Sequence, residues 1–214
     1  MSDFRRKLMM YKKSESELPS EYQQVDYIEF NGNEYILLNT VTLQENVTYK
    51  AECSISFTSF TPNINTFYLN GFTSGFAFGL TYNKLTDGYG YGTLPSTVNV
   101  KINQIYDFLV FFDGKYQYTY VDGEFYHERT QGSFYTSNDV RYPIGCSYSS
   151  KNPAYFCKQR LHQRYRLYIN DSLIFDGIPC YNKSSKESGL YDTISKRFFG
   201  NMSANGNITY GNEV

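Results

Sequence analysis

The chain has 214 residues, a formal net charge of −1, and aromatic side chains at 19% of its positions, with 23 tyrosines and no tryptophan. This near-neutral charge excludes a globally basic nucleic-acid-binding protein, because affinity for phosphate comes from clustered Lys and Arg. No run of about 20 apolar residues occurs, so no segment is expected to span a membrane. Aromatic residues suit the half-buried surface of a sheet, so the composition favours strands over helices.

The first 18 residues differ in composition from the rest of the chain. A basic and apolar stretch is followed by a polar, charged one, and Phe4, Leu8 and Tyr11 lie at the spacing of an amphipathic helix. So short a helix is marginal on its own. No apolar core of signal-peptide length is present. We expect residues 1–18 to form an attachment segment, flexible or docked on a partner, and residues 19–214 to form one domain.

The basic stretch supplies the residues expected to make the attachment. These are Phe4, Arg5, Arg6, Lys7, Leu8 and Met9. Three cationic residues give little affinity for nucleic acid or for an anionic membrane at physiological salt. Docking on another protein would use both the charged and the apolar side chains, and a disordered terminus is the alternative.

Strand periodicity begins after this segment. Residues 47–57 alternate, with every odd-numbered side chain apolar or aromatic, and residues 74–82 also alternate, with Phe76, Phe78 and Leu80 on one face. Asp113-Gly114 and Asp122-Gly123 then separate three apolar runs. Asp-Gly pairs accept the positive φ of a tight hairpin turn, so these runs predict an antiparallel meander.

The second half of the chain is divided between loops and strands. Residues 131–159 are rich in Ser, Asn and Tyr, and we expect loops around one strand at residues 140–147. Residues 164–169 alternate again, and a turn at Asn170-Asp171 leads into another apolar run. Strands without intervening helical patterns predict an all-β antiparallel sandwich.

Groups suited to catalysis or metal binding are sparse. The four cysteines, Cys53, Cys146, Cys157 and Cys180, include no Cys-x-x-Cys pair and are expected to be buried free thiols. His127 and His162 lie in separate polar segments, and both are expected at the surface. Glu124 and Glu128 beside His127 form the nearest carboxylate cluster, and they follow a hairpin turn as solvated edge charges would. No enzymatic activity, cofactor or metal is therefore predicted.

Calcium is an alternative, because aspartates occupy several predicted turns. They are Asp87, Asp113, Asp122, Asp139 and Asp171. Aspartate is also a common turn residue for conformational reasons alone, so these positions do not define a site.

Tyrosine-rich loops are the strongest candidates for a binding surface. Residues 82–92 form a glycine-rich stretch, and later loops are expected to present Tyr135, Tyr142, Tyr148 and Tyr155. The residues predicted to bind a glycan or a protein partner are Tyr82, Asp87, Tyr89, Tyr91, Tyr148 and Tyr155. Tyrosine is a rigid, amphipathic contact residue for either kind of partner, so the choice stays open.

Both ends of the domain carry a family resemblance. Leu18 to Glu29, followed by Gly32 to Ile36, resembles the opening of a concanavalin A-like (laminin G-like) jelly-roll family found in bacteriophages and prophages of gut bacteria. The closing pattern of that family is similar to residues 166–169, 175–182, 189–192 and 198–201, and its Val-Asp-Gly hairpin is similar to residues 120–124. The resemblance covers about 190 residues and implies a concanavalin A-like β-sandwich.

The leading segment resembles short basic leaders that precede such domains in phages of Bacteroides-like hosts. This implies a virion structural protein, either a capsid decoration (auxiliary) protein or a fibre-associated module, made in the host cytoplasm. Its N-terminal segment would bind capsid, fibre or tail proteins, and its sandwich could bind host or mucosal glycans. A stand-alone carbohydrate-binding, lectin-like module is the alternative. Self-association through exposed sheet edges stays open.

Overall fold

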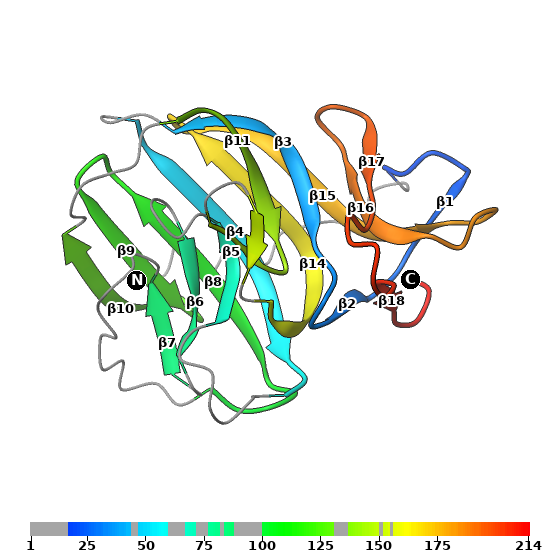
Figure 1. Cartoon of the computed structure of the whole chain (residues 1–214), viewed down its shortest axis with the longest axis horizontal. Coiled ribbons are helices and arrows are strands. Elements are labelled where there is room, and N and C mark those ends of the chain that lie inside the picture. The colour runs from blue at the N-terminus through cyan, green and yellow to red at the C-terminus, as the bar shows by residue number, and fades with distance from the viewer. Residues whose placement is uncertain are drawn as a thin grey trace.

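The computed structural model describes residues 17–43, 47–59, 67–71, 77–81, 84–87, 100–130, 137–149, 152–154 and 156–214. These residues form β-strands and no helix, and all named strands that pair with one another are antiparallel (Figure 1). No described helix is long and apolar enough to cross a membrane. The predicted all-β antiparallel sandwich is therefore confirmed.

The larger sheet has eleven strands, and its main path runs β10-β9-β8-β4-β14-β15-β16-β17. Its strands are β1 (Tyr22–Gln24), β2 (Tyr27–Asn31), β4 (Tyr49–Phe57), β8 (Ile105–Phe112), β9 (Tyr116–Val121), β10 (Glu124–Thr130), β14 (Lys158–Ile169), β15 (Ser172–Asn182), β16 (Ser188–Asp192), β17 (Arg197–Phe199) and β18 (Thr209–Tyr210). Off the main path, β1 pairs with β15, and β2 pairs with both β14 and β18.

The smaller sheet has five strands in the order β3-β11-β5-β6-β7. They are β3 (Ile36–Leu43), β5 (Phe67–Gly71), β6 (Ala77–Thr81), β7 (Lys84–Asp87) and β11 (Ser137–Ile144). A separate pair joins β12 (Ser147–Ser149) to β13 (Asn152–Ala154). Figure 1 shows β3 and β11 crossing the face of the larger sheet as a second layer.

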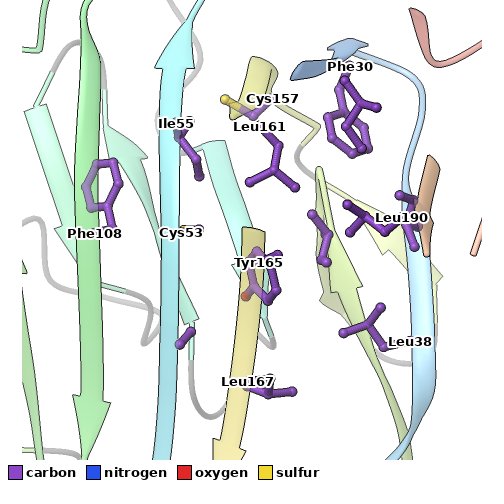
Figure 2. Close-up of a cluster of buried hydrophobic side chains, with 14 of the residues drawn as sticks. Phe30, Leu38, Cys53, Ile55, Phe108, Cys157, Leu161, Tyr165, Leu167 and Leu190 are labelled. Carbon is purple, nitrogen blue, oxygen red and sulfur yellow. The ribbon is translucent and has the colours of Figure 1, made fainter. Parts of the chain in front are cut away.

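The core lies between the two layers. In β4 every odd-numbered residue from Tyr49 to Phe57 is buried, as the alternation predicts. Phe108 of β8, Leu161 and Tyr165 of β14, and Leu38 of β3 join the same buried cluster (Figure 2). Each face of β4 therefore has one role: odd-numbered side chains fill the core, and even-numbered ones point away from it.

The Asp-Gly hairpins form as expected. β8 pairs with β9, and β9 pairs with β10, so the three strands make the predicted meander. Gly114 and Gly123 both have positive φ, at 99° and 79°. Asp122 also has positive φ, at 52°, and its carboxylate accepts a hydrogen bond from the backbone N–H of Asp107 at 2.9 Å. Asp122 therefore adopts the backbone conformation that the turn requires, and its side chain also stabilises the turn by a hydrogen bond.

Three expectations about loops and strands need correction or refinement. Tyr142, expected to be presented by a loop, lies in β11, which overlaps the strand expected over residues 140–147; it is 1% exposed, because its side chain joins the core. The strand expected over residues 74–82 is β6, which spans Ala77–Thr81. Lys84–Asp87, expected to be part of a loop, forms the edge strand β7 against β6.

The four cysteines are free and buried, as predicted. Burial raises the pKa of Cys157 to about 12 and that of Cys180 to about 12. These thiols are therefore protonated and shielded, which is the state of core residues rather than of nucleophiles.

The start of the described chain packs on the domain. Leu18 is 8% exposed and lies in a small apolar cluster with Ile178, Cys180 and Tyr191. Glu17 forms an ion pair with Arg164 of β14. Residues 17 and 18 are therefore held in place on the larger sheet.

Candidate functional site

The face of the larger sheet that points away from the core carries aromatic and charged side chains on neighbouring strands. We call it the outer face. It is formed by Lys50, Glu52, Ser54 and Ser56 of β4, Asp107, Leu109 and Phe111 of β8, Tyr116, Tyr118 and Tyr120 of β9, and Arg160, His162, Arg164, Arg166 and Tyr168 of β14. Most of these side chains are half-buried, so the surface is both ordered and accessible.

One end of the outer face is aromatic. Phe111 lies opposite Tyr118 in the register, and their rings stack with centroids 6.0 Å apart and an interplanar angle of 21°. Tyr120 lies opposite Phe125 of β10, and these rings meet edge to face at 5.4 Å. Phe125 is 56% exposed. We call these four residues the aromatic row.

The other end of the outer face is organised around Asp176 of β15. This carboxylate is 5% exposed and accepts hydrogen bonds from Arg164, from Arg166 Nε at 3.1 Å, and from Thr193 Oγ1 at 3.1 Å. Arg166 reaches it because the residue lies directly opposite Asp176 in the β14–β15 register, and Arg164 lies two residues earlier on the same face of β14. A buried carboxylate with two guanidinium partners is a rigid junction between strands.

Further ion pairs cover the middle of this face. Lys50 Nζ lies 3.3 Å from Glu52 and 3.8 Å from the centroid of the Tyr168 ring. The Tyr168 hydroxyl donates to Glu52 at 3.2 Å. Burial, together with the negative charge of Glu52, raises the pKa of Tyr168 to about 12. Tyr168 therefore stays protonated at neutral pH and acts as a hydrogen-bond donor.

A similar group lies at the β2 side of the face. Arg160 Nε donates to Glu29 at 2.7 Å, and the guanidinium lies 4.8 Å from the centroid of the Tyr27 ring. Each cation of this half therefore has both a carboxylate and packed neighbours, which fixes its long side chain.

A serine and a histidine that are distant in sequence meet on the outer face. Ser56 Oγ and His162 Nε2 lie 2.8 Å apart, and burial lowers the pKa of His162, which favours the neutral ring. This is nucleophile–base spacing. Ser56, however, is 2% exposed and sits in a strand paired on both sides, and no described carboxylate hydrogen-bonds the histidine. A buried serine with no orienting third group is poorly suited to attack a substrate. The side chain of His162, predicted to lie at the surface, is half-buried.

No described group of three His, Cys, Asp or Glu side chains could hold a metal ion. The turn aspartates have local roles. Asp113 accepts hydrogen bonds from the backbone N–H groups of Lys115 at 2.9 Å and Tyr116 at 2.7 Å, and from the Tyr118 hydroxyl at 3.0 Å. Asp171 has a positive φ of 60° in the turn between β14 and β15. Asp139 lies in β11. Asp113 and Asp171 therefore agree with the conformational explanation, whereas the prediction that Asp139 and Asp87 lie in turns is wrong, because both belong to strands.

Most of the predicted binding residues lie outside the described part of the chain. This holds for Tyr82, Tyr89, Tyr91 and Tyr155, and for the attachment residues Phe4, Arg5, Arg6, Lys7, Leu8 and Met9. Asp87 ends β7 and Tyr148 lies in β12, with only their backbones described. The predicted loop site and attachment segment therefore stay predictions. His127 lies in the edge strand β10, again with only its backbone described.

The outer face was not predicted from the sequence. Its aromatic row comes from β8, β9 and β10, and its charged half from β4, β14 and β15. A signal was present, because the alternation of residues 106–121 leaves Leu109, Phe111, Tyr118 and Tyr120 on the face opposite to the core. Large aromatic residues on the solvent side of a strand are a reason to look for a binding surface.

Comparison with known proteins identifies the fold. The sequence matches no family model and no curated protein. Among solved structures, a Bacteroides ovatus protein described as carbohydrate-binding aligns over 89% of this chain with a TM-score of 0.60 and 13% identity. The alignment spans 62% of that protein, which is less than two thirds of its length.

Weaker likenesses are to enzymes. A Trypanosoma rangeli sialidase aligns over 72% of this chain and 27% of its own, with a TM-score of 0.47 and 10% identity. The alginate lyase AlgAT5 of polysaccharide lyase family 7 aligns over 60% of this chain and 62% of its own, with a TM-score of 0.39 and 11% identity. The alignment with the Bacteroides ovatus protein, at 13% identity, shows a shared fold alone: this chain is an all-β sandwich of the same architecture.

Proposed function

We propose that this chain is a carbohydrate-binding module without enzymatic activity, and that it binds glycans on the outer face of its larger sheet. The observation that carries the proposal is the aromatic row beside an ordered, hydrogen-bonding surface. Sugar rings present apolar C–H faces that pack on aromatic rings, and hydroxyl groups that pair with carboxylates, guanidinium groups and phenols. The outer face supplies both kinds of group on strands held by the core.

The fold comparison supports this proposal, because the Bacteroides ovatus protein described as carbohydrate-binding shares the architecture over most of this chain. The absence of catalytic activity rests on the site itself. On this face Ser56 forms a hydrogen bond with His162, but Ser56 is buried and therefore poorly placed to attack a substrate. The loop tyrosines predicted from sequence remain a second proposed contact region.

A glycan array followed by calorimetric titration tests the proposal. Phe111→Leu and Tyr118→Leu keep an apolar side chain in the strand but remove the ring, and each should weaken binding about tenfold. Tyr210→Leu is the matched control, because Tyr210 is 37% exposed and stacks on Tyr181, away from the aromatic row. Melting temperatures verify that each variant is folded.

Two results would count against the outer face. Binding that survives both aromatic-row substitutions but disappears in Tyr89→Ala or Tyr91→Ala would move the site to the loop predicted from sequence. No binding to any glycan would remove the proposed function altogether. Release of sugar from a bound polysaccharide would contradict the absence of enzymatic activity.

A virion role is a second proposal, and it comes from the resemblance of residues 4–9 and of the domain to phage proteins. The domain holds Leu18 in an apolar cluster and Glu17 in an ion pair, so an attachment segment before them would start from a fixed point. Deletion of residues 1–16 should abolish association with phage particles while leaving glycan binding unchanged. Particle association that persists without these residues would remove the proposed role of the segment.

A further inference from the structure

We infer that the glycan bound by the outer face is an uncharged oligosaccharide that crosses the strands of the larger sheet. This inference rests on the proposed function and adds the class of ligand and its direction. Two independent features carry it: the way charges are paired on the outer face, and the order in which aromatic and polar groups follow one another across the strands.

Four cations in the charged half of the outer face already have internal carboxylate partners. Lys50 pairs with Glu52 at 3.3 Å, and Arg160 pairs with Glu29 at 2.7 Å. Arg166 Nε lies 3.1 Å from Asp176 Oδ1. Arg164 is held between Asp176 and Glu17.

The balance of charge on the face follows from this pairing. In its charged half, the cations Lys50, Arg160, Arg164 and Arg166 are matched by Glu17, Glu29, Glu52 and Asp176. Asp107 adds a further carboxylate, which accepts a hydrogen bond from Ser54. A uronate, sialate or sulfate group would have to displace one of these carboxylates or lie beside it. Both cost free energy, because like charges repel and a displaced carboxylate loses its partner.

Neutral sugars avoid this cost. A hydroxyl group can donate to a carboxylate oxygen that has spare lone pairs, and it can accept from a guanidinium or phenol, without adding charge. Hydrogen bonds to ionised groups are also stronger than those between neutral groups. Glu52 and Arg166 are half-buried and adjacent in the register, so the pair presents acceptor and donor together.

The register gives the direction of the ligand. Phe111 and Tyr118 lie opposite each other on β8 and β9, and Lys50 and Tyr168 continue the same line onto β4 and β14. The neighbouring line runs from Tyr120 through Leu109 and Glu52 to Arg166. The first line therefore runs from two aromatic rings to a lysine and a phenol, and the second runs from an aromatic ring to a carboxylate and a guanidinium group.

The length of these lines sets the size of the ligand. From β9 to β14 there are three inter-strand steps of about 4.8 Å, or roughly 14 Å. This distance exceeds a single sugar ring, so an oligosaccharide is needed to contact both ends. A monosaccharide would reach one end alone.

Calorimetric titration of the full chain tests the inference. The probes are neutral cello-, xylo- and manno-oligosaccharides of increasing length, and polygalacturonate, alginate and chondroitin sulfate as acidic glycans. We expect binding to a neutral series, with affinity rising at least about tenfold from disaccharide to longer oligomers. Affinity should change less than about twofold between about 50 mM and 500 mM NaCl, because no net charge is neutralised.

The variant Glu52→Gln provides a second measurement. It removes the carboxylate that pairs with Lys50 while keeping the shape of the side chain. We expect it to acquire binding to polygalacturonate that weakens as salt is raised. A variant that gains none would contradict the role assigned to charge pairing.

The outcomes separate this inference from the proposed function. Tight, salt-sensitive binding of an acidic glycan by the unmodified chain would overturn the inference and leave carbohydrate binding intact. Equal affinity for a monosaccharide and its oligomers would overturn the direction across the strands. Absence of binding to every neutral and acidic probe would overturn both the inference and the proposed function.

Discussion

Replacing Asp176 by alanine should be among the most destabilising single changes on the outer face. Removing one partner of a buried ion pair costs about 3–5 kcal/mol, because the remaining charge stays desolvated. Here the Arg164 and Arg166 side chains are 23% and 19% exposed, and each has a further carboxylate in Glu17 or Glu52. Water and these carboxylates offset part of the loss, so we expect about 3 kcal/mol.

Urea unfolding followed by circular dichroism, together with a thermal melt, measures this change. For a chain of this size, 1 kcal/mol corresponds to about 2–4 °C, so Asp176→Ala should lower Tm by about 6–12 °C. Asp176→Asn keeps the shape and one acceptor, and should cost less. Glu124→Ala is the control, because Glu124 is exposed, and its effect should stay within about 0.5 kcal/mol. A loss below about 1 kcal/mol for Asp176→Ala would refute the argument that this carboxylate organises the charged half.

Further changes probe the backbone, the titrating histidine and the buried thiols. Gly145→Ala should lower the free energy of unfolding by about 2–4 kcal/mol, because φ is +92° and the new Cβ would lie 2.6 Å from Phe30. Gly123→Ala is the control: its φ is +79° and the new Cβ would have no atom within 4 Å, so it should lower the free energy of unfolding by about 1 kcal/mol. Because burial lowers the pKa of His162, the stability it contributes is present above pH of about 6.5 and is lost as pH falls through the folded-state pKa. His162→Gln should therefore flatten the fall of the urea midpoint between pH of about 7.5 and 5.5, and an unchanged slope would exclude this histidine as the cause. The four thiols are buried, and burial raises the pKa of Cys157 to about 12. A thiol reagent at pH of about 8 should therefore label no cysteine in the native chain and all four after denaturation. Fast labelling of the native chain would contradict the burial of the thiols.

The strands were predictable where one face is apolar and the turn chemistry is explicit. β4 shows this best, since alternation over residues 49–57 alone assigns the core side chains. The meander β8-β9-β10 was predictable from its two Asp-Gly pairs. In both cases the information is local, because a period of two and a positive φ are properties of adjacent residues.

The outer face was not predicted, because aromatic residues occur on both faces of β8, next to the tyrosines of β9. Phe108 and Phe112 enter the core, whereas Phe111 and Tyr118 do not, and composition alone does not distinguish them. Tyr142 was expected in a loop because the surrounding segment, residues 131–159, is rich in Ser, Asn and Tyr.

The charged half depends on pairing between segments that are far apart in the chain. Arg160 meets Glu29 across 131 positions, and Tyr168 meets Glu52 across 116. The bulge in β14 adds to the difficulty, because the register shift changes which residues of β4 and β14 lie opposite each other.

The paired cations of the outer face also bear on how selectively it could bind. A free lysine or arginine side chain samples many rotamers, and fixing it costs up to about 2 kcal/mol in conformational entropy. Lys50 is held by Glu52 and the Tyr168 ring, and Arg160 by Glu29 and the Tyr27 ring, so folding has already immobilised them. A ligand would meet a surface with few rotamers left to freeze. Such a surface discriminates by shape, because it does not adjust to a ligand that fits poorly.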